Sequence, residues 1–311
     1  MKIAISGSMA FDRMMRFPDH FQRHLLPEEL HRVNVCFVVP TLSVDFGGCA
    51  GNIAYNLKLL GEEKSTFIVS ALGKDSAPYR ERLKNLGLSD DFIYQDETQF
   101  SAQAFITTDE NGNQITFFHP GAMAAAQNVV MNKDFDLAII APSGLDVMLQ
   151  HARECAALKI PFFFDPGQNL PLFDKELLRE MMNRAAAFIV NDYEAAMLCE
   201  RVELSVAEIA QKIEVLIVTH GEKGSSIFTE NKEIQIAALA VQNPKDPTGC
   251  GDAYRAGLLY GRAHGWSWEK SGKLASVLGA LKIECAGGQN HTPTLEKIAQ
   301  RFEETFGEKM L

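Results

Sequence analysis

The sequence predicts an α/β protein with a mostly parallel central sheet that is covered by helices on both faces. Short apolar runs typical of buried strands alternate with longer segments whose apolar residues recur at helical spacing. Two β-rich regions, at 33–39 and 101–119, interrupt this alternation. The chain has 311 residues, of which 46% are hydrophobic, enough for one large core and a smaller appendage.

The elements of the core follow from the apolar runs and from the glycines and prolines between them. The first strand is expected over 2–7, and a helix is expected from residue 50 onward. Further strands are expected at 66–71, 137–141, 161–165, 187–191, 215–219 and 225–228. Further helices are expected near 77–87, 144–158, 174–185, 192–200, 204–213, 250–264, 267–285 and 293–304.

The β-rich regions predict a small sheet outside the main one. Residues 33–39 have strong β propensity, and 101–108 and 114–119 flank an Asn-Gly pair that is typical of a hairpin. We expect a single domain with an α/β core at about 1–10, 47–97 and 120–311. The β appendage is expected in two pieces, at about 11–46 and 98–119.

Composition excludes several classes of function. The net charge is −10 and there is no long basic run, which argues against a nucleic-acid partner. No apolar run is long enough to span a bilayer, and the first residues are typical of a strand rather than a signal peptide. The six cysteines lie far apart and are expected to be reduced thiols. We therefore expect a cytoplasmic protein without a membrane partner.

The stretch from Asp246 to Asp252 carries the clearest chemical signal. It is a glycine-rich loop that runs into a helix, so its backbone N–H groups lack helical acceptors and suit an anion. Gly249, Cys250 and Gly251 are small enough for a ligand to approach the backbone closely. The Asp252 carboxylate beside this anion site can take a proton from an attacking hydroxyl group.

The stretch 246–257 resembles the C-terminal signature of the ribokinase-like (PfkB-type) carbohydrate and nucleoside kinases. The stretch 46–61 resembles the N-terminal signature of the same family, and the resemblance covers nearly the whole chain. It implies a ribokinase-like three-layer α/β/α sandwich in which the β appendage is a lid. It also implies that Asp252 is the catalytic base and that Gly249, Cys250 and Gly251 form the anion hole. Cys250 departs from the family, which usually has alanine or valine there.

The acceptor site is expected around the first strand and the glycine pair. A carboxylate at Asp12 can accept hydrogen bonds from two vicinal sugar hydroxyls, although an Asx turn or a helix cap explains it equally well. The resemblance implies that Gly47, Gly48 and Asn52 contact the sugar of the acceptor. The alternative for Asn52 is an ordinary helix N-cap.

The nucleotide site is expected at two loops that follow apolar strands. Asn191 to Glu194 resembles the family's Asn-x-x-Glu motif, which orders Mg²⁺ through water, and a capping box is the alternative. Thr219 to Gly224 resembles the nucleotide loop, and a hairpin turn is the alternative. The residues implied to bind ATP are Asn191, Thr219, Gly221, Gly224, Thr248, Gly249 and Gly251. Asp165 also follows an apolar run and is expected at the same sheet edge.

A potassium site is a further expectation from the resemblance. Family members often bind K⁺ beside the anion hole through the first Asp of the motif and nearby carbonyl oxygens. The matching residues here are Asp246 and the bend from Cys285 to Gly288. The alternative is that Asp246 simply braces the turn.

The acceptor is expected to be adenosine. Motifs at 15–18, 25–28, 47–54, 120–123, 191–194 and 246–257 resemble the bacterial adenosine kinase branch of the family. This implies ATP-dependent phosphorylation of the 5′-hydroxyl group of adenosine. A purine needs aromatic surface, which Phe100, Phe105, Phe117 or Phe118 can supply, and Phe118 best matches the branch. The alternative, which applies to at least half of these rings, is that they pack the lid on itself or on a second subunit. Gln168 suits either a purine or a sugar.

Other functions remain as alternatives. A ribokinase-like sugar kinase, an inosine or guanosine kinase and a non-catalytic nucleoside-binding protein would share many of these residues. A dinucleotide fingerprint is disfavoured because Tyr254 stands where its third glycine belongs, and a P-loop motif is absent. The resemblance also implies a homodimer that forms through the lid.

Overall fold

The computed structural model describes residues 1–25, 31–32, 34–229 and 232–310. The motif at 25–28 and the strand expected over 33–39 lie partly outside these residues. Within the described residues, no helix combines the length and the apolar character needed to cross a membrane.

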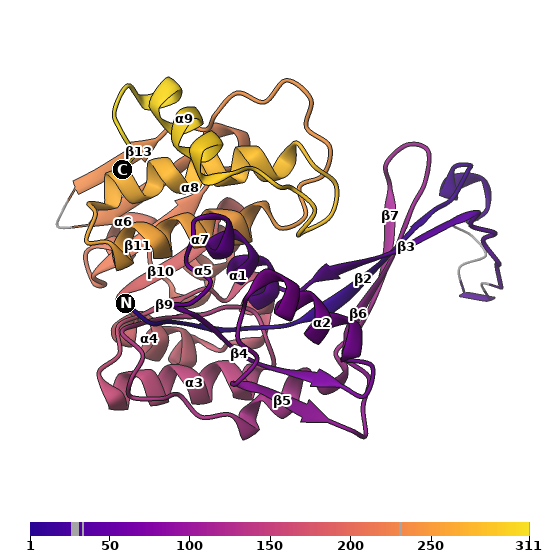
Figure 1. The fold of residues 1–311 in the computed structure, drawn as a ribbon, viewed down its shortest axis with the longest axis horizontal. Helices are drawn as coiled ribbons and strands as arrows, with labels where there is room; N and C mark the ends of the chain where they lie inside the picture. Colours follow the sequence, from indigo (N-terminus) through magenta and orange to yellow (C-terminus); the bar gives the residue numbers. More distant parts are fainter. Residues whose placement is uncertain (26–30, 33, 230–231, 311) are drawn as a thin grey trace.

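A nine-stranded sheet forms the centre of the described chain (Figure 1). Its strands are β1 (Ile3–Ser6), β4 (Thr66–Gly73), β5 (Ile93–Asp96), β8 (Leu137–Ile140), β9 (Phe162–Phe164), β10 (Ala187–Asn191), β11 (Val215–Thr219), β12 (Ser225–Thr229) and β13 (Lys232–Ile236). Their order across the sheet is β13-β12-β11-β10-β9-β8-β1-β4-β5. Every pair from β11 to β5 is parallel, and only β12 and β13 pair antiparallel. The predicted mostly parallel sheet is confirmed.

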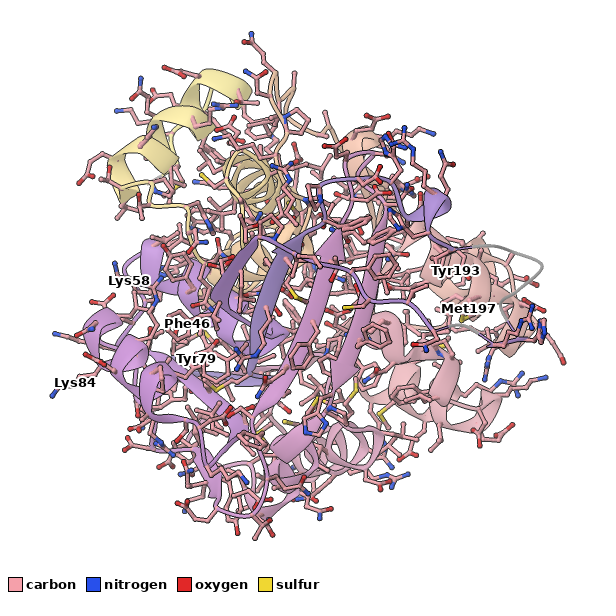
Figure 2. The ribbon with its side chains drawn as sticks, turned by 90° about the vertical axis from the view of Figure 1, so that its right-hand side faces the viewer. Phe46, Lys58, Tyr79, Lys84, Tyr193 and Met197 are labelled. Atoms are coloured by element: carbon pink, nitrogen blue, oxygen red, sulfur yellow. The ribbon has the colours of Figure 1, made fainter. Side chains whose placement is uncertain are left out.

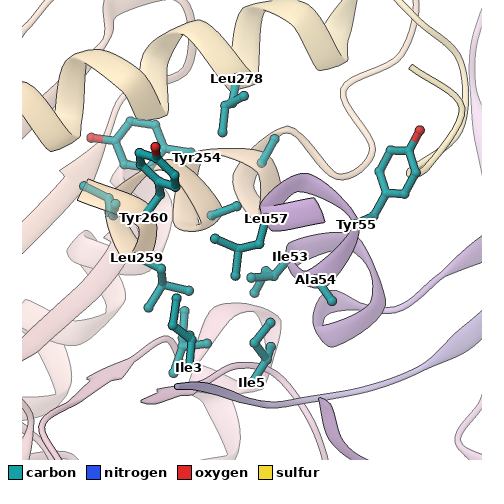
Figure 3. Packing of buried hydrophobic residues seen from close by; sticks show 14 of the residues in the cluster. Ile3, Ile5, Ile53, Ala54, Tyr55, Leu57, Tyr254, Leu259, Tyr260 and Leu278 are labelled. Carbon is teal, nitrogen blue, oxygen red and sulfur yellow. The ribbon is translucent and has the colours of Figure 1, made fainter. Parts of the chain in front are cut away.

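Helices cover both faces of this sheet, because its strands alternate apolar side chains between two buried clusters. One cluster includes Ile3 and Ile5 of β1 and residues of α1 (Cys49–Leu59), α2 (Ala77–Leu86), α7 (Cys250–Ala263), α8 (Trp268–Ile283) and α9 (Leu295–Phe306). Figure 3 shows Ile53, Leu57, Leu259 and Leu278 converging above β1. The other cluster holds Ala4 with residues of α3 (Leu145–Leu158), α4 (Lys175–Arg184), α5 (Asp192–Val202) and α6 (Val206–Ala210).

A separate four-stranded sheet projects from this body (Figure 1). Its strands are β2 (Ala10–Arg16), β3 (Thr41–Gly47), β6 (Ala102–Thr108) and β7 (Gln114–His119), in the order β3-β2-β6-β7. The hairpin predicted at 101–119 is confirmed as β6 and β7. The chain enters the sheet at β2, directly after β1, and leaves it at Gly47, directly before α1.

The strand predicted over 33–39 is wrong for its described part, because residues 34–39 form no strand. The partner of β2 is β3, which lies later, at 41–47. Phe37 instead packs its ring against Phe17 and Phe21, at centroid distances of 4.9 and 5.2 Å. Phe37, whose β propensity contributed to the predicted strand, therefore packs in an aromatic cluster instead. The predicted helix 204–213 is also shorter, since α6 is limited to Val206–Ala210.

Candidate active site

The glycine-rich loop enters α7 as predicted. Gly249 is the N-cap residue and has the left-handed φ of 77°. A Cβ atom at this position would lie 3.3 Å from Gly288 Cα, so the loop is tight as well as left-handed. The N–H of Cys250 donates to the carbonyl oxygen of Pro247 at 3.1 Å, and Gly251 and Asp252 follow it on the first turn of α7. This helix N-terminus is therefore available for an anion.

Asp252 lies on the first turn of α7, where Asn52 of α1 holds its carboxylate. Asn52 Nδ2 donates a hydrogen bond of 2.8 Å to Asp252 Oδ2. Burial raises the pKa of Asp252 to about 6, and the bond from Asn52 partly opposes this shift. A carboxylate with this pKa is ionised at neutral pH and is still a better base than an exposed aspartate.

A buried chain of hydrogen bonds fixes Asn52 in turn. Gln289 Nε2 donates to Asn52 Oδ1 at 3.2 Å and to the Tyr79 hydroxyl oxygen at 3.0 Å. The Tyr79 hydroxyl donates to the carbonyl oxygen of Gly47 at 2.8 Å. Tyr79 also packs against Phe46, with ring centroids 5.1 Å apart (Figure 2). The sequence analysis missed Tyr79 and Gln289, and the predicted contact of Asn52 with the acceptor stays a prediction.

Asp12 lies on β2, close to the other acidic groups of the site. Burial raises its pKa to about 7, and the negative charges of Asp45, Asp252 and Asp246 add to the shift. A Cβ atom on Gly47 would lie 2.2 Å from Asp12 Oδ2, so only glycine leaves room for this carboxylate. The structure thus brings Asp12 and Asp252 into one acidic environment.

Gly48 is required for a different reason. It has a φ of 84°, and a Cβ atom there would lie 2.5 Å from the carbonyl oxygen of Ser8. The residue is the N-cap of α1 and joins that helix to the last residue of β3. The glycine pair therefore lies at the junction between the small sheet and the core.

The strand ends at the sheet edge converge as predicted. A cavity of about 470 Å³ is lined by Asp165, Asn191, Thr219 and Asp252, and also by Glu194, Gln168 and Arg255. Arg255 was missed by the sequence analysis, although it lies one helical turn after Asp252. Its Nε donates to Asp165 Oδ2 at 2.8 Å and its Nη2 to Asp165 Oδ1 at 3.1 Å, and this buried pair raises the pKa of Arg255. Both residues line the cavity that Asp252 also borders, so their ion pair holds part of its wall in place.

Asn191 and Glu194 form a complete capping box at the start of α5. Asn191 Oδ1 accepts from Glu194 N and Glu194 Oε2 accepts from Asn191 N, both at 2.8 Å. No group of three or more His, Cys, Asp or Glu residues in the described chain could hold a metal ion. Asn191 and Glu194 line the cavity that Asp252 also borders, and an amide and a carboxylate in this position fit a Mg²⁺ ion that keeps its water ligands. The capping box, which was the alternative interpretation of this motif, is therefore present. The role of Asn191 and Glu194 toward Mg²⁺ stays a prediction.

A second cavity, of about 750 Å³, adjoins the first, because Thr219, Gly221 and Gly251 line both. Its walls are largely apolar and include Leu239, Val241 and Ile283. Gly224 also lines it with a φ of 96°, and a Cβ atom there would lie 2.0 Å from the carbonyl oxygen of Ile236. Gly249 lines only the smaller cavity. Of the described residues predicted to bind ATP, Thr248 alone lines neither cavity, and its N–H donates to Asp246 Oδ1 at 2.9 Å.

The small sheet places the predicted phenylalanines on different faces. Asp12, Ala104 and Phe118 occupy one cross-strand row, so their side chains share a face. Phe105 and Phe117 pair with each other in the next row and face the opposite side. Phe100 lies before β6 with the Lys74 ammonium 4.2 Å from its ring centroid. Only Phe118, which is 52% exposed, shares the face of Asp12.

Asp246 braces the two loops beside the anion hole. Its Oδ1 accepts from Thr248 N at 2.9 Å and its Oδ2 from Gly287 N at 2.7 Å. The Lys282 ammonium donates to the carbonyl oxygens of Asp246, at 2.8 Å, and of Cys285, at 2.9 Å. Lys282 was not singled out from the sequence. The sequence signal that could have identified Lys282 is its spacing: it follows Leu278 by four residues and so lies on the apolar face of α8.

Comparison with known proteins agrees with this geometry. Residues 8–295 match the pfkB family of carbohydrate kinases. A nucleoside kinase of Methanocaldococcus jannaschii is 31% identical over 279 residues, which cover 89% of this chain and 91% of that protein. The solved structure of the Burkholderia thailandensis nucleoside kinase in complex with inosine is 45% identical, covers 99% of both chains and superimposes with a TM-score of 0.89.

More distant structures agree in fold. The Arabidopsis thaliana ribokinase complexed with ribose and ATP is 18% identical, covers 97% of this chain and 98% of that chain, and superimposes with a TM-score of 0.78. The fold is thus the ribokinase fold, with a large, mostly parallel sheet, covering helices and a separate small sheet. The chain belongs to the pfkB family of carbohydrate kinases, and it is a phosphotransferase with an alcohol group as acceptor.

Proposed function

We propose that the protein is a nucleoside kinase that transfers the terminal phosphoryl group of MgATP to the 5′-hydroxyl of a purine nucleoside. The observation that carries this proposal is the position of Asp252. It lies on the first turn of α7, is held by Asn52 and borders a cavity that continues into a larger apolar cavity. This arrangement suits a base between a donor phosphate and an acceptor hydroxyl.

Each residue has a distinct role in this reaction. Asp252 takes the proton of the acceptor hydroxyl, and the N–H groups of Gly249 to Asp252 stabilise negative charge on the transferred group. Thr219, Gly221 and Gly224 border the space for ATP, and Asn191 and Glu194 lie where water-bound Mg²⁺ is expected. When bound, Mg²⁺ neutralises phosphate charge. Asp12 accepts hydrogen bonds from the ribose hydroxyls next to Gly47 and Gly48.

Adenosine is the acceptor that we propose within this class. Phe118 shares the face of Asp12 and offers a flat apolar surface to a purine, and Gln168 lines the cavity of Asp252. Inosine is the second candidate, since the Burkholderia kinase binds it and matches this chain along nearly its whole length. A polar pocket for a free sugar is less compatible with the exposed ring of Phe118.

A panel of acceptors with MgATP tests this proposal. Adenosine is expected to have the highest kcat/KM, and inosine and guanosine lower values. Ribose and fructose 6-phosphate are expected to react poorly, because they leave the aromatic surface bare. A preference for inosine would change the nucleoside but keep the class, and a preference for a free sugar would overturn the nucleoside proposal.

The expected cytoplasmic location stays a prediction.

We also propose that the small sheet is a lid that closes over the acceptor. Asp12 is on this sheet, and the glycine pair joins the sheet to α1. Closure would exclude water from the transferred phosphoryl group. Hydrogen exchange measures this directly: a nucleoside should slow exchange at amides of β2 and β6, and unchanged exchange would contradict the lid.

The other face of the lid is the proposed dimer contact. Leu42, Val44 and Phe117 share that face and are 62%, 47% and 70% exposed. Such a cluster of exposed apolar residues is typical of an interface. The wild-type protein is expected to sediment at twice the 34.4 kDa of one chain, and Phe117→Lys as a monomer. Val130→Lys, at an exposed apolar residue outside the lid, is the control. A monomeric wild type would exclude the dimer.

A further inference from the structure

Lys282 is a fully buried lysine in the last turn of α8. Its helix neighbours Leu278 and Leu281 are also buried. An ammonium group in such a place is unfavourable unless other groups replace its water. The replacements here are backbone carbonyl oxygens: Lys282 Nζ donates to the oxygen of Asp246 at 2.8 Å and to that of Cys285 at 2.9 Å.

These two carbonyl groups belong to the loops that flank the anion hole. The loop of Asp246 leads into α7, and the loop of Cys285 follows α8. The Asp246 carboxylate connects the same loops, since it accepts N–H bonds from Thr248 and Gly287. Gly288 of the second loop packs directly on Gly249. Lys282 therefore stabilises the backbone from which the N–H groups of the anion hole extend.

Carbonyl oxygens beside a carboxylate are also the ligands that suit K⁺, because hard cations take oxygen donors. A lysine ammonium carries the same single charge and a similar size. Two positive charges at the same oxygen atoms would repel strongly in a buried site. The site predicted for K⁺ from the sequence, at Asp246 and residues 285–288, therefore does not fit a free cation, because its carbonyl oxygens already bind Lys282.

We propose that Lys282 is a built-in substitute for a monovalent cation, so that this kinase needs neither K⁺ nor Na⁺. Its ammonium keeps the anion-hole loops in place and adds a fixed positive charge near the transferred phosphoryl group. The effect of this charge reaches α7: burial raises the pKa of the Cys250 thiol to about 11, and Lys282 opposes that shift. The inference rests on the phosphotransferase activity and is independent of which nucleoside is the acceptor.

The first test uses the wild-type protein with the Tris salt of ATP and its best acceptor. Activity and melting temperature are measured at equal ionic strength with K⁺, Na⁺ or tetramethylammonium as the sole added monovalent cation. Both quantities are expected to be equal in the three salts. Activation of the wild type by K⁺ over tetramethylammonium would overturn the proposal. The melting temperature needs no acceptor, so this measurement remains valid if the nucleoside assignment fails.

The second test uses Lys282→Met, which keeps an unbranched side chain that is one atom shorter and removes the charge. In tetramethylammonium its kcat is expected to fall by about 10²-fold, as when one group that stabilises transition-state charge is lost. K⁺ or NH₄⁺ should restore part of the activity and raise the melting temperature of this variant. Lys273→Met is the control: Lys273 is on the same helix but pairs with Glu269 and Glu308 at the surface. It should show no response to K⁺.

A purely structural role for Lys282 predicts a different result. Lys282→Met would then lose stability equally in all salts, and K⁺ would restore neither activity nor melting temperature. That outcome would overturn the proposal. If Lys282→Met does not fold, Lys282→Gln, which keeps polar donors, takes its place. Failure of both variants to fold in K⁺ would also overturn the proposal, since K⁺ should occupy the position that the Lys282 ammonium has left.

Discussion

Replacing Asp252 with asparagine is expected to lower kcat by about 10²–10⁴-fold while the acceptor still binds. Asparagine has the same size and still offers an oxygen to Asn52 Nδ2, but it cannot take the proton of the acceptor hydroxyl. The positions of α7 and of the anion hole should therefore persist. Steady-state kinetics gives kcat, and calorimetry gives the Kd of the acceptor for the variant.

The control for this substitution is Asp146→Asn, which removes an exposed carboxylate from the first turn of α3. This control tests whether the loss of any carboxylate charge from the first turn of a helix lowers kcat. We expect Asp146→Asn to leave kcat unchanged. The pH profile adds a second criterion. Because burial raises the pKa of Asp252 to about 6, the kcat of the wild type should fall as the pH drops through that value. Nearly normal kcat in folded Asp252→Asn would refute the role as base.

The core could be predicted because its strands carry their signal locally. Strands such as β1 and β8 are buried on both faces, so each is a continuous apolar run in the sequence. Strands β2 and β3 of the small sheet carry no such signal. β2 contains Asp12, Arg13 and Arg16, and β3 is half-buried at most until Gly47. Their existence depends on pairing with each other and with β6, which sequence periodicity does not reveal.

The residues of the site can also be divided into those that the sequence predicts and those that it does not. Asp252, Gly249 and the capping box at Asn191 lie in short contiguous motifs, so their place at helix starts could be predicted. The partners that hold them could not. Gln289 bonds to Asn52 across 237 positions of the chain, and Arg255 bonds to Asp165 across 90. Only the fold brings such pairs together, and each residue alone is an unremarkable polar side chain.

The second large effect is expected at Asp12, where acceptor binding and protein stability should change in opposite directions. In the wild type the carboxylate can accept hydrogen bonds from two ribose hydroxyls, and bonds to charged groups contribute about 1.5–3 kcal/mol each. Asp12→Asn keeps one acceptor oxygen and loses the charge. The kcat/KM for the acceptor should fall by about 10²-fold, mainly through KM, whereas the KM for ATP should stay unchanged.

Stability should increase, because burial and the neighbouring carboxylates make the negative charge of Asp12 unfavourable. Its pKa in the folded protein is about 7, against 3.8 for an unperturbed carboxyl group, so the folded state binds more protons than the unfolded state between these values. Stability of the wild type therefore decreases as the pH rises from about 4 to about 7. Asp12→Asn removes this penalty and should increase the free energy of unfolding by about 1–3 kcal/mol at pH 8 and hardly at all at pH 4.

Urea unfolding at the two pH values, together with acceptor kinetics, measures both effects on the same preparation. Asp134→Asn, an exposed carboxylate outside both cavities, should change neither quantity. A variant that binds the acceptor normally would remove Asp12 from the acceptor site. One that is weaker in binding and also less stable at pH 8 would mean that the carboxylate supports the lid structurally. Weaker acceptor binding together with higher stability is the result that fits an Asp12 carboxylate that binds the acceptor. Gly47 leaves room for this carboxylate, and the negative charges of Asp45, Asp252 and Asp246 make its ionised form unfavourable.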